Sequence, residues 1–155
     1  MSNQFDSLIQ LMRDLTKTLD QLTTVQKAVA SAVHADDLTA LGECMKKENA
    51  LSLTLRNIDQ KREKLQQELG LSGVKLSELP AKIPDEETRR VVKQAAEELN
   101  AQYRVMQSAA EVARSALECS LYEVENMMTR MGIDPKQVEQ QTASANNRAH
   151  TDFRA

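Results

Sequence analysis

Residues Asp85–Met131 read DEETRRVVKQAAEELNAQYRVMQSAAEVARSALECSLYEVENMMTRM. The stretch follows Pro84, precedes Gly132, and contains no proline or glycine of its own. It is dominated by Ala, Glu, Leu, Met, Gln and Arg, which are the strongest helix formers. Because proline and glycine are typical helix boundaries, the stretch predicts one uninterrupted helix of roughly 70 Å at about 1.5 Å per residue.

Apolar side chains form two rows along this predicted helix. The first row has the spacing of a helix face that packs on another helix, and it consists of Val92, Ala95, Leu99, Met106, Ala109, Ala113 and Ala116. The second row diverges from the first and consists of Tyr103, Ala110, Leu117, Leu121, Val124 and Met128. Either neighbouring helices cover both rows, or part of the second row is left for a partner.

The preceding residues supply two further helices. Phe5 to about Val33 carries one apolar stripe and Leu38–Leu69 carries another. Asp36 or Asp37 is expected to cap the second helix, because a short carboxylate side chain accepts hydrogen bonds from the free N–H groups of a first turn. Gly42 lies inside the second helix, where it either permits a close approach of the first helix or marks a bend.

A loop separates the second helix from the long one. Gly70 is expected to close the second helix as a C-cap, while Pro80 and Pro84 exclude a regular helix from Ser72–Pro84. Apolar residues within this loop predict that it packs against the end of the bundle. A single helical turn is expected at Leu76–Leu79.

The chain after the long helix is polar. Asp134 and Pro135 predict the start of a short helix that reaches Gln141, with Val138 as its only apolar residue. Thr142–Ala155 cannot bury enough apolar area to offset its ordering entropy, so a flexible tail is expected.

The predicted fold is therefore all-α, an elongated antiparallel helical bundle or coiled coil of three long helices. One bundle domain is expected over residues 1–131. Residues 132–155 are expected to form the short helix and the mobile C-terminal segment.

Composition excludes several functions. The chain has 155 residues, a net charge of −3 and 3% aromatic residues. The charges of both signs are mixed and no basic patch suits a phosphate backbone, so nucleic acid is not an expected partner. No apolar run is long enough for membrane insertion and the N-terminus lacks a basic leader, so a cytoplasmic location is expected.

The candidate reactive residues are few. Cys44 and Cys119 lie among apolar helical positions and are expected to be buried thiols in a reducing compartment. His34 and His150 fit no metal-ligand or catalytic spacing, and no glycine-rich phosphate loop is present. The sequence therefore predicts no enzyme activity, no metal and no cofactor.

Several short motifs resemble the FlgN family of flagellar (type III) export chaperones. They lie in the second helix and the loop, at Lys47–Leu51, Leu55–Arg62, Leu69–Leu71 and Leu76–Leu79. The order and lengths of the predicted helices are also similar to that family over most of the chain. The chain departs from the family at Ala109–Arg114, where members often carry Asn, and in the tail, which lacks their Tyr-Gly pair.

The resemblance implies a cytoplasmic chaperone that binds the C-terminal helical segment of the hook–filament junction proteins FlgK and FlgL. Such a chaperone prevents premature assembly and delivers these proteins to the export gate, so gate or ATPase components are further partners. The resemblance implies a tyrosine that docks on the export gate, and the nearest tyrosine to the tail is Tyr122, which lies inside the long helix. We expect its ring to be partly exposed because it shares a face with Glu118, Glu125, Asn126 and Thr129.

The C-terminal half of the long helix is the expected client-binding region, because an amphipathic client helix can pack along its apolar residues. Methionine side chains adapt to varied surfaces, although ordinary core packing is an alternative for them. The candidate client-binding residues are Leu117, Leu121, Val124, Met127, Met128, Met131 and Val138. The alternative function is a structural coiled-coil scaffold that self-associates, as a homodimer for example, without a client.

Overall fold

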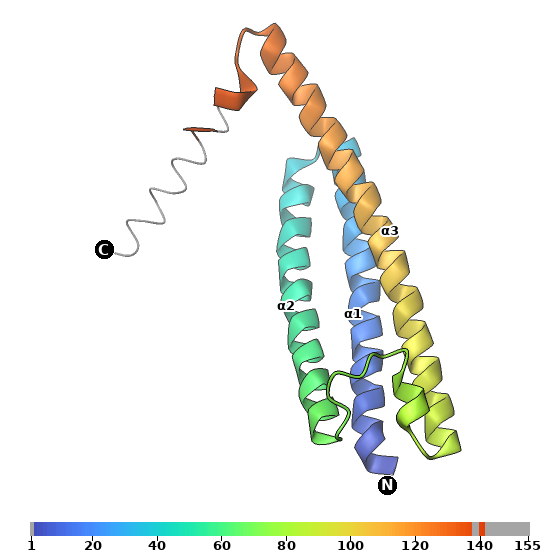
Figure 1. Cartoon of the computed structure of the whole chain (residues 1–155). Helices are drawn as coiled ribbons and strands as arrows, with labels where there is room; N and C mark the ends of the chain where they lie inside the picture. Colours follow the sequence, from blue (N-terminus) through green and yellow to red (C-terminus); the bar gives the residue numbers. More distant parts are fainter. Residues whose placement is uncertain (1, 138–139, 142–155) are drawn as a thin grey trace. The chain divides into compact units, whose positions relative to one another are not determined.

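The computed structural model describes residues 2–137 and 140–141, and this part of the chain contains helices and no strand (Figure 1). The helices are α1 (Ser2–His34), α2 (Leu38–Glu68), the short 3-10 helix η1 (Leu79–Lys82) and α3 (Glu86–Arg130). The all-α fold and its three long helices are confirmed. Residues 135–137 and 140–141 are also helical. Val138 and the predicted tail lie outside the described residues.

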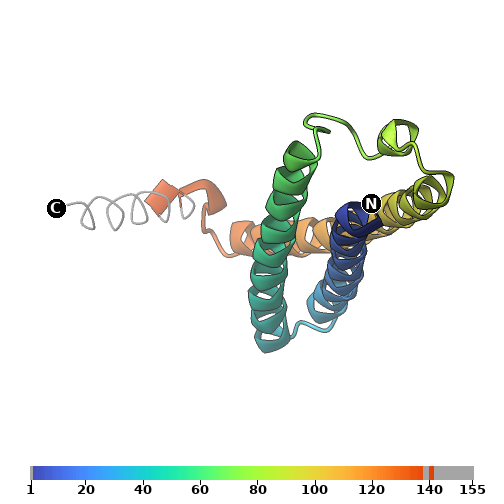
Figure 2. The ribbon, with the colours of Figure 1, turned by 90° about the horizontal axis from the view of Figure 1, so that it is seen from below.

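The chain divides into two compact units, Met1–Ala116 and Leu117–Ala155. In the first unit, α1 lies between α2 and the first part of α3 (Figures 1 and 2). The apolar face of α1 is consequently the most deeply buried helix face in this unit. It includes Leu8, Ile9, Met12, Leu15, Leu19, Leu22, Val25 and Val29. Val92, Ala95, Leu99, Ala113 and Ala116 of the first row on α3 are buried as well.

The turn between α1 and α2 is fixed by two neighbouring aspartates. Asp36 adopts a left-handed backbone conformation with φ of 53°. This conformation lets the N–H of Asp37 bond to the carbonyl of Ala32 at 2.9 Å, as in a Schellman ending of a helix. The Asp37 side chain then accepts a hydrogen bond from the N–H of Ala40 at 3.0 Å. Asp37 is therefore the N-cap of α2, one of the two residues expected for that position.

Gly42 is not needed for close packing of α2 against α1. A Cβ atom built at this position meets no heavy atom within 4 Å, so the expectation of a close contact with α1 is wrong. Gly42→Ala is expected to raise the free energy of unfolding by about 0.5–1 kcal/mol, because alanine loses less backbone entropy on folding than glycine. Urea denaturation measures this change.

Gly70→Ala is the matched control for Gly42→Ala. Gly70 has equal space around it but a left-handed φ of 74°, which alanine adopts only with strain. The control variant is expected to be less stable than the wild type. A Gly42→Ala variant that loses stability as well would contradict the open environment of this glycine.

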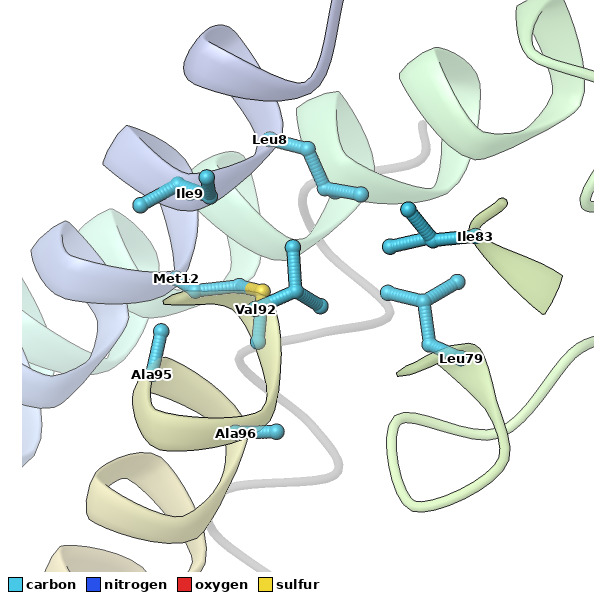
Figure 3. Packing of buried hydrophobic residues seen from close by; sticks show 8 residues of the cluster. All are labelled: Leu8, Ile9, Met12, Leu79, Ile83, Val92, Ala95 and Ala96. Atoms are coloured by element: carbon cyan, nitrogen blue, oxygen red, sulfur yellow. The ribbon is translucent and has the colours of Figure 1, made fainter. Parts of the chain in front are cut away.

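The loop between α2 and α3 belongs to the core (Figure 3). Leu79 and Ile83 are fully buried against Leu8, Met12 and Val92. The expectation that the loop packs on the bundle is confirmed. The expected turn at Leu76–Leu79 is confirmed, because the N–H groups of Glu78 and Leu79 bond to the carbonyl of Lys75 at 2.9 and 3.0 Å. The 3-10 helix Leu79–Lys82 follows it directly; Pro80 suits the start of a helix, where its missing N–H is not needed.

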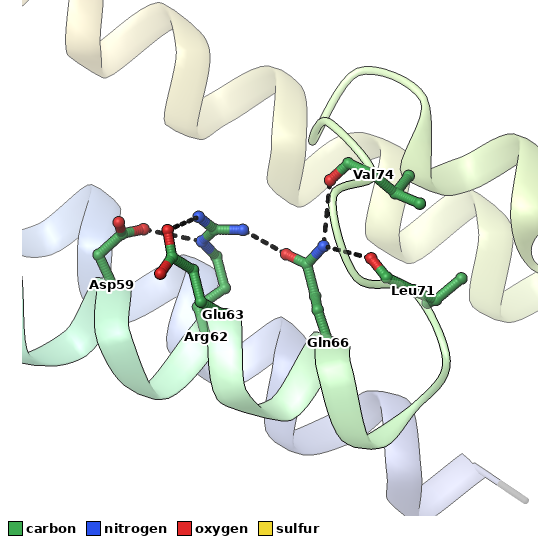
Figure 4. A network of polar contacts seen from close by, with 6 residues as sticks. All are labelled: Asp59, Arg62, Glu63, Gln66, Leu71 and Val74. Atoms are coloured by element: carbon green, nitrogen blue, oxygen red, sulfur yellow. Dashed lines mark hydrogen bonds and ion pairs between the residues drawn. The ribbon is translucent and has the colours of Figure 1, made fainter.

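A buried glutamine holds the beginning of this loop on α2 (Figure 4). The Nε2 atom of Gln66 donates to the carbonyl oxygens of Leu71 at 3.3 Å and Val74 at 3.1 Å. Its Oε1 atom accepts a hydrogen bond from Arg62, which also pairs with Asp59 at 2.8 Å. Gln66 is thus buried with its side-chain polar groups satisfied, as a buried amide requires.

Asp85 caps the start of α3, directly before Glu86 and Glu87. Its carboxylate accepts hydrogen bonds from the hydroxyl and the backbone N–H of Thr88. These contacts lower the pKa of Asp85 from its usual 3.8. The hydrogen bond from the Thr88 hydroxyl is the largest cause, and the hydrogen bond from the Thr88 backbone N–H is the second. A carboxylate whose pKa is lowered by folding stabilises the protein above its unfolded pKa.

The wild type is therefore expected to be more stable than an Asp85→Ala variant at neutral pH, and this advantage should shrink as the pH falls below 3.8 towards the lower folded pKa. Thermal unfolding of both proteins at a series of pH values measures the difference. A difference in stability that stays constant down to about pH 2 would contradict this role of the ionised carboxylate.

Candidate functional site

Most of the predicted client-binding residues lie in the second unit, on the last turns of α3. We call Leu117, Leu121, Val124, Met127, Met128 and Met131 the apolar stripe. At 3.6 residues per turn they fall within an arc of about 120° on one helix face. The structure thus brings six of the seven candidate residues together on one surface, while Val138 lies outside the described residues.

The apolar stripe is largely uncovered. Val124 is 49% exposed, Leu121 53%, Met127 62% and Met131 68%, while Leu117 and Met128 are half-buried. Core packing therefore does not account for Met127 and Met131. Large apolar side chains gathered on one exposed face typically mark a surface that binds a partner.

One further apolar residue was missed by the sequence analysis. Gly132 has a left-handed φ of 78°, and the N–H of Ile133 bonds to the carbonyl of Met128 at 2.9 Å. This Schellman ending brings Ile133, which is 41% exposed, close to the apolar stripe. The signal was available, because an apolar residue commonly follows the glycine of such a helix ending.

Tyr122 lies on the opposite face of the same helical segment. Its side chain is 65% exposed, so the prediction of partial exposure is confirmed. It lines a cavity of about 400 Å³ together with Asn126, Thr129 and Lys136. Cys119 shares this polar face and is exposed, so the prediction of a buried thiol is wrong there; the other cysteine, Cys44, is buried as predicted.

A second concave feature lies entirely within the first unit. We call it the α2–α3 groove, and its volume is about 1230 Å³. Leu15 and Leu19 of α1 contribute to its lining, Leu55 comes from α2, and Leu99 and Tyr103 come from α3. The sequence analysis did not predict this groove, because it depends on the distance between two helices that each pack on α1.

Metal-ligating side chains do not gather at one place among the described residues. No cluster of three or more His, Cys, Asp or Glu side chains suited to a metal ion occurs among them. No helix in the described ranges is long and apolar enough to cross a membrane.

An all-α bundle with an apolar groove and an uncovered apolar stripe defines a protein suited to binding other helices. The comparison with family models agrees with this class. The chain belongs to the FlgN family, since the family model described as "FlgN protein" matches residues 1–142. As a member of this family, the chain is a flagellar export chaperone. Proteins of this family are not enzymes. Neither a curated protein nor a solved structure matches it.

Proposed function

We propose that this chaperone binds the C-terminal helical segment of the hook–filament junction proteins, FlgK-like and FlgL-like, through the apolar stripe. The observation that carries the proposal is an exposed apolar face at the C-terminal end of α3. It is formed by Leu121, Val124, Met127 and Met131. A client segment of this kind is amphipathic, and two amphipathic helices remove their apolar faces from water by packing together.

A chaperone bound to the C-terminal segment of its client would keep that segment from assembling before export. Junction proteins assemble through surfaces that must stay apart until export, so a bound chaperone in the cytoplasm prevents early association. The polar face carrying Tyr122 stays accessible when a client occupies the apolar stripe, because the two lie on opposite sides of the helix. Tyr122 is accordingly the proposed contact with the export gate, through which the client is delivered.

The test is a binding experiment with the full chain and purified C-terminal segments of the junction proteins from the same bacterium. Light scattering after size separation is expected to show a one-to-one complex. The N-terminal segment of the same junction protein serves as the control and is expected to remain unbound. If no C-terminal segment forms a complex at any concentration at which the chaperone stays in solution, these clients are ruled out.

A further inference from the structure

The α2–α3 groove has the size needed to hold a helix. Its volume of about 1230 Å³ exceeds the roughly 300–1,000 Å³ that is usual for small-molecule sites. Along α3 its lining runs from Arg89 to Tyr103, which is about four helical turns or about 21 Å. The loop residues Leu76 and Pro80 also contribute to the lining. A helix of this length would lie between α2 and α3.

The inner surface of the groove is apolar and only partly covered. Of all the residues in α2, only Cys44 and Gln66 are buried, so Leu55 on the α2 wall stays half-buried. On the α3 wall, Tyr103 is 49% exposed. Tyrosine rings are frequent anchors of protein interfaces. The groove thus offers apolar surface that a bound helix would remove from water.

Three cations line the groove and lie on both of its walls. Arg56 belongs to α2, while Arg89 and Lys93 belong to α3, and none of the three forms an ion pair within the described residues. The Arg89 guanidinium is held in position by two backbone carbonyls. Its Nε atom donates to the carbonyl of Ile83 at 3.0 Å and its Nη2 atom donates to that of Pro84 at 3.2 Å.

Two carboxylates in the lining do not balance these cations. Asp59 is already paired with Arg62 at 2.8 Å, which leaves Glu97 against the three positive charges. Because the cations lie on both walls, a helix in the groove is attracted most strongly when acidic residues run along both edges of its apolar face.

The apolar stripe in the second unit has flanks of the opposite charge. Leu117–Met131 contains three glutamates and a single arginine. At 3.6 residues per turn, Glu118 and Glu125 lie along one edge of the apolar stripe and Glu123 lies along the other. A helix with basic flanks therefore suits the apolar stripe, whereas a helix with acidic flanks suits the α2–α3 groove. The two surfaces should select different helices.

We propose that the α2–α3 groove is a second helix-binding site, which takes an amphipathic helix with acidic flanks from a partner protein. The groove lies entirely in the first unit, whereas the apolar stripe lies in the second. One molecule then carries separate sites for two helices of opposite charge. This inference does not depend on which client the apolar stripe binds.

Two designed peptides of about 18 residues, or five helical turns, test the charge preference. Both carry the same leucine face with one tryptophan on it, and the edges of that face are glutamate in one peptide and lysine in the other. The chain contains no Trp, so the shift in peptide fluorescence on burial measures binding. The protein is the full chain with Leu121→Gln, Val124→Gln and Met128→Gln, which removes binding to the apolar stripe.

The glutamate peptide is expected to bind one-to-one and at least about tenfold more tightly than the lysine peptide. The net charge of the chain is −3, which favours the lysine peptide in any unspecific association. A preference for the glutamate peptide therefore reports the local charge of the groove. The difference should shrink in about 0.5 M salt, where exposed charges are screened.

Arg56→Glu with Lys93→Glu reverses the charge on both walls of the groove. Both side chains are exposed, so the variant should fold, as circular dichroism can check. The glutamate peptide is expected to bind this variant at least about tenfold more weakly. The control is Lys46→Glu with Lys47→Glu, which changes the net charge equally on an exposed part of α2 outside the groove. It should leave the preference unchanged.

Three results would overturn the second site. They are a lysine peptide that binds as tightly as the glutamate peptide or more so, a preference that persists after charge reversal of the groove, and no binding of either peptide, as expected if another segment of the chain or a second copy fills the groove. The proposed function fails separately, since it is tested on the wild type with segments of junction proteins. Binding of the glutamate peptide without binding of any junction segment would contradict only the proposed function.

Discussion

Replacing Leu121, Val124 and Met128 together by glutamine is expected to weaken client binding by roughly 100-fold. Burying an apolar side chain of this size is worth about 1.5–3 kcal/mol. Three partly buried side chains would then contribute about 3 kcal/mol, or about two orders of magnitude in Kd. Glutamine is a good helix former, so α3 should persist. Isothermal titration of the variant with the C-terminal segment of a junction protein measures the loss.

The matched control places three glutamines on the opposite face of the same segment, as Cys119→Gln, Asn126→Gln and Thr129→Gln. These positions are exposed and lie apart from the apolar stripe. Client affinity of the control is expected to stay within about threefold of the wild type. Equal losses in both variants would show that binding depends on the helix as a whole and would contradict a site on the apolar stripe.

Leu79→Ala is expected to lower the free energy of unfolding by about 2–5 kcal/mol, the usual cost of truncating a fully buried leucine. Leu79 has no exposed surface and packs with Leu8, Met12 and Ile83, although it lies in a loop region. The loss combines the transfer of apolar atoms to water with the cavity that remains in the first unit. Guanidinium denaturation followed by circular dichroism measures it.

Leu53→Ala on α2 is the control for this change, because it removes the same atoms from a side chain that is 58% exposed. Its effect on the free energy of unfolding is expected to stay within about 0.5 kcal/mol. Equal effects of the two substitutions would contradict the placement of the loop in the core.

The boundaries of α3 were predictable because strong local signals mark them. Pro84 and Asp85 lie at its start, and Gly132 ends it with a left-handed backbone. The cap at Asp37 and the first apolar row followed from equally local rules of spacing and hydrogen bonding. Such rules need no knowledge of the neighbouring elements.

Features that depend on neighbours were harder to predict. The spacing of apolar residues showed which face of α1 is buried, but it did not show that α1 lies between both other helices. For the same reason the burial of Cys119 was predicted wrongly, since its apolar neighbours in sequence lie on a different face of α3. The α2–α3 groove was missed because it is a property of three elements and the loop between them.

The most direct test of the proposed site is photo-crosslinking at single positions of the full chain. A benzophenone amino acid in place of Val124 lies on the apolar stripe, while the same group in place of Asn126 lies on the opposite, polar face. On illumination with the C-terminal segment of a junction protein, a covalent product is expected from position 124 and none from position 126. A product from position 126 alone, or equal products from both positions, would contradict client binding through the apolar stripe.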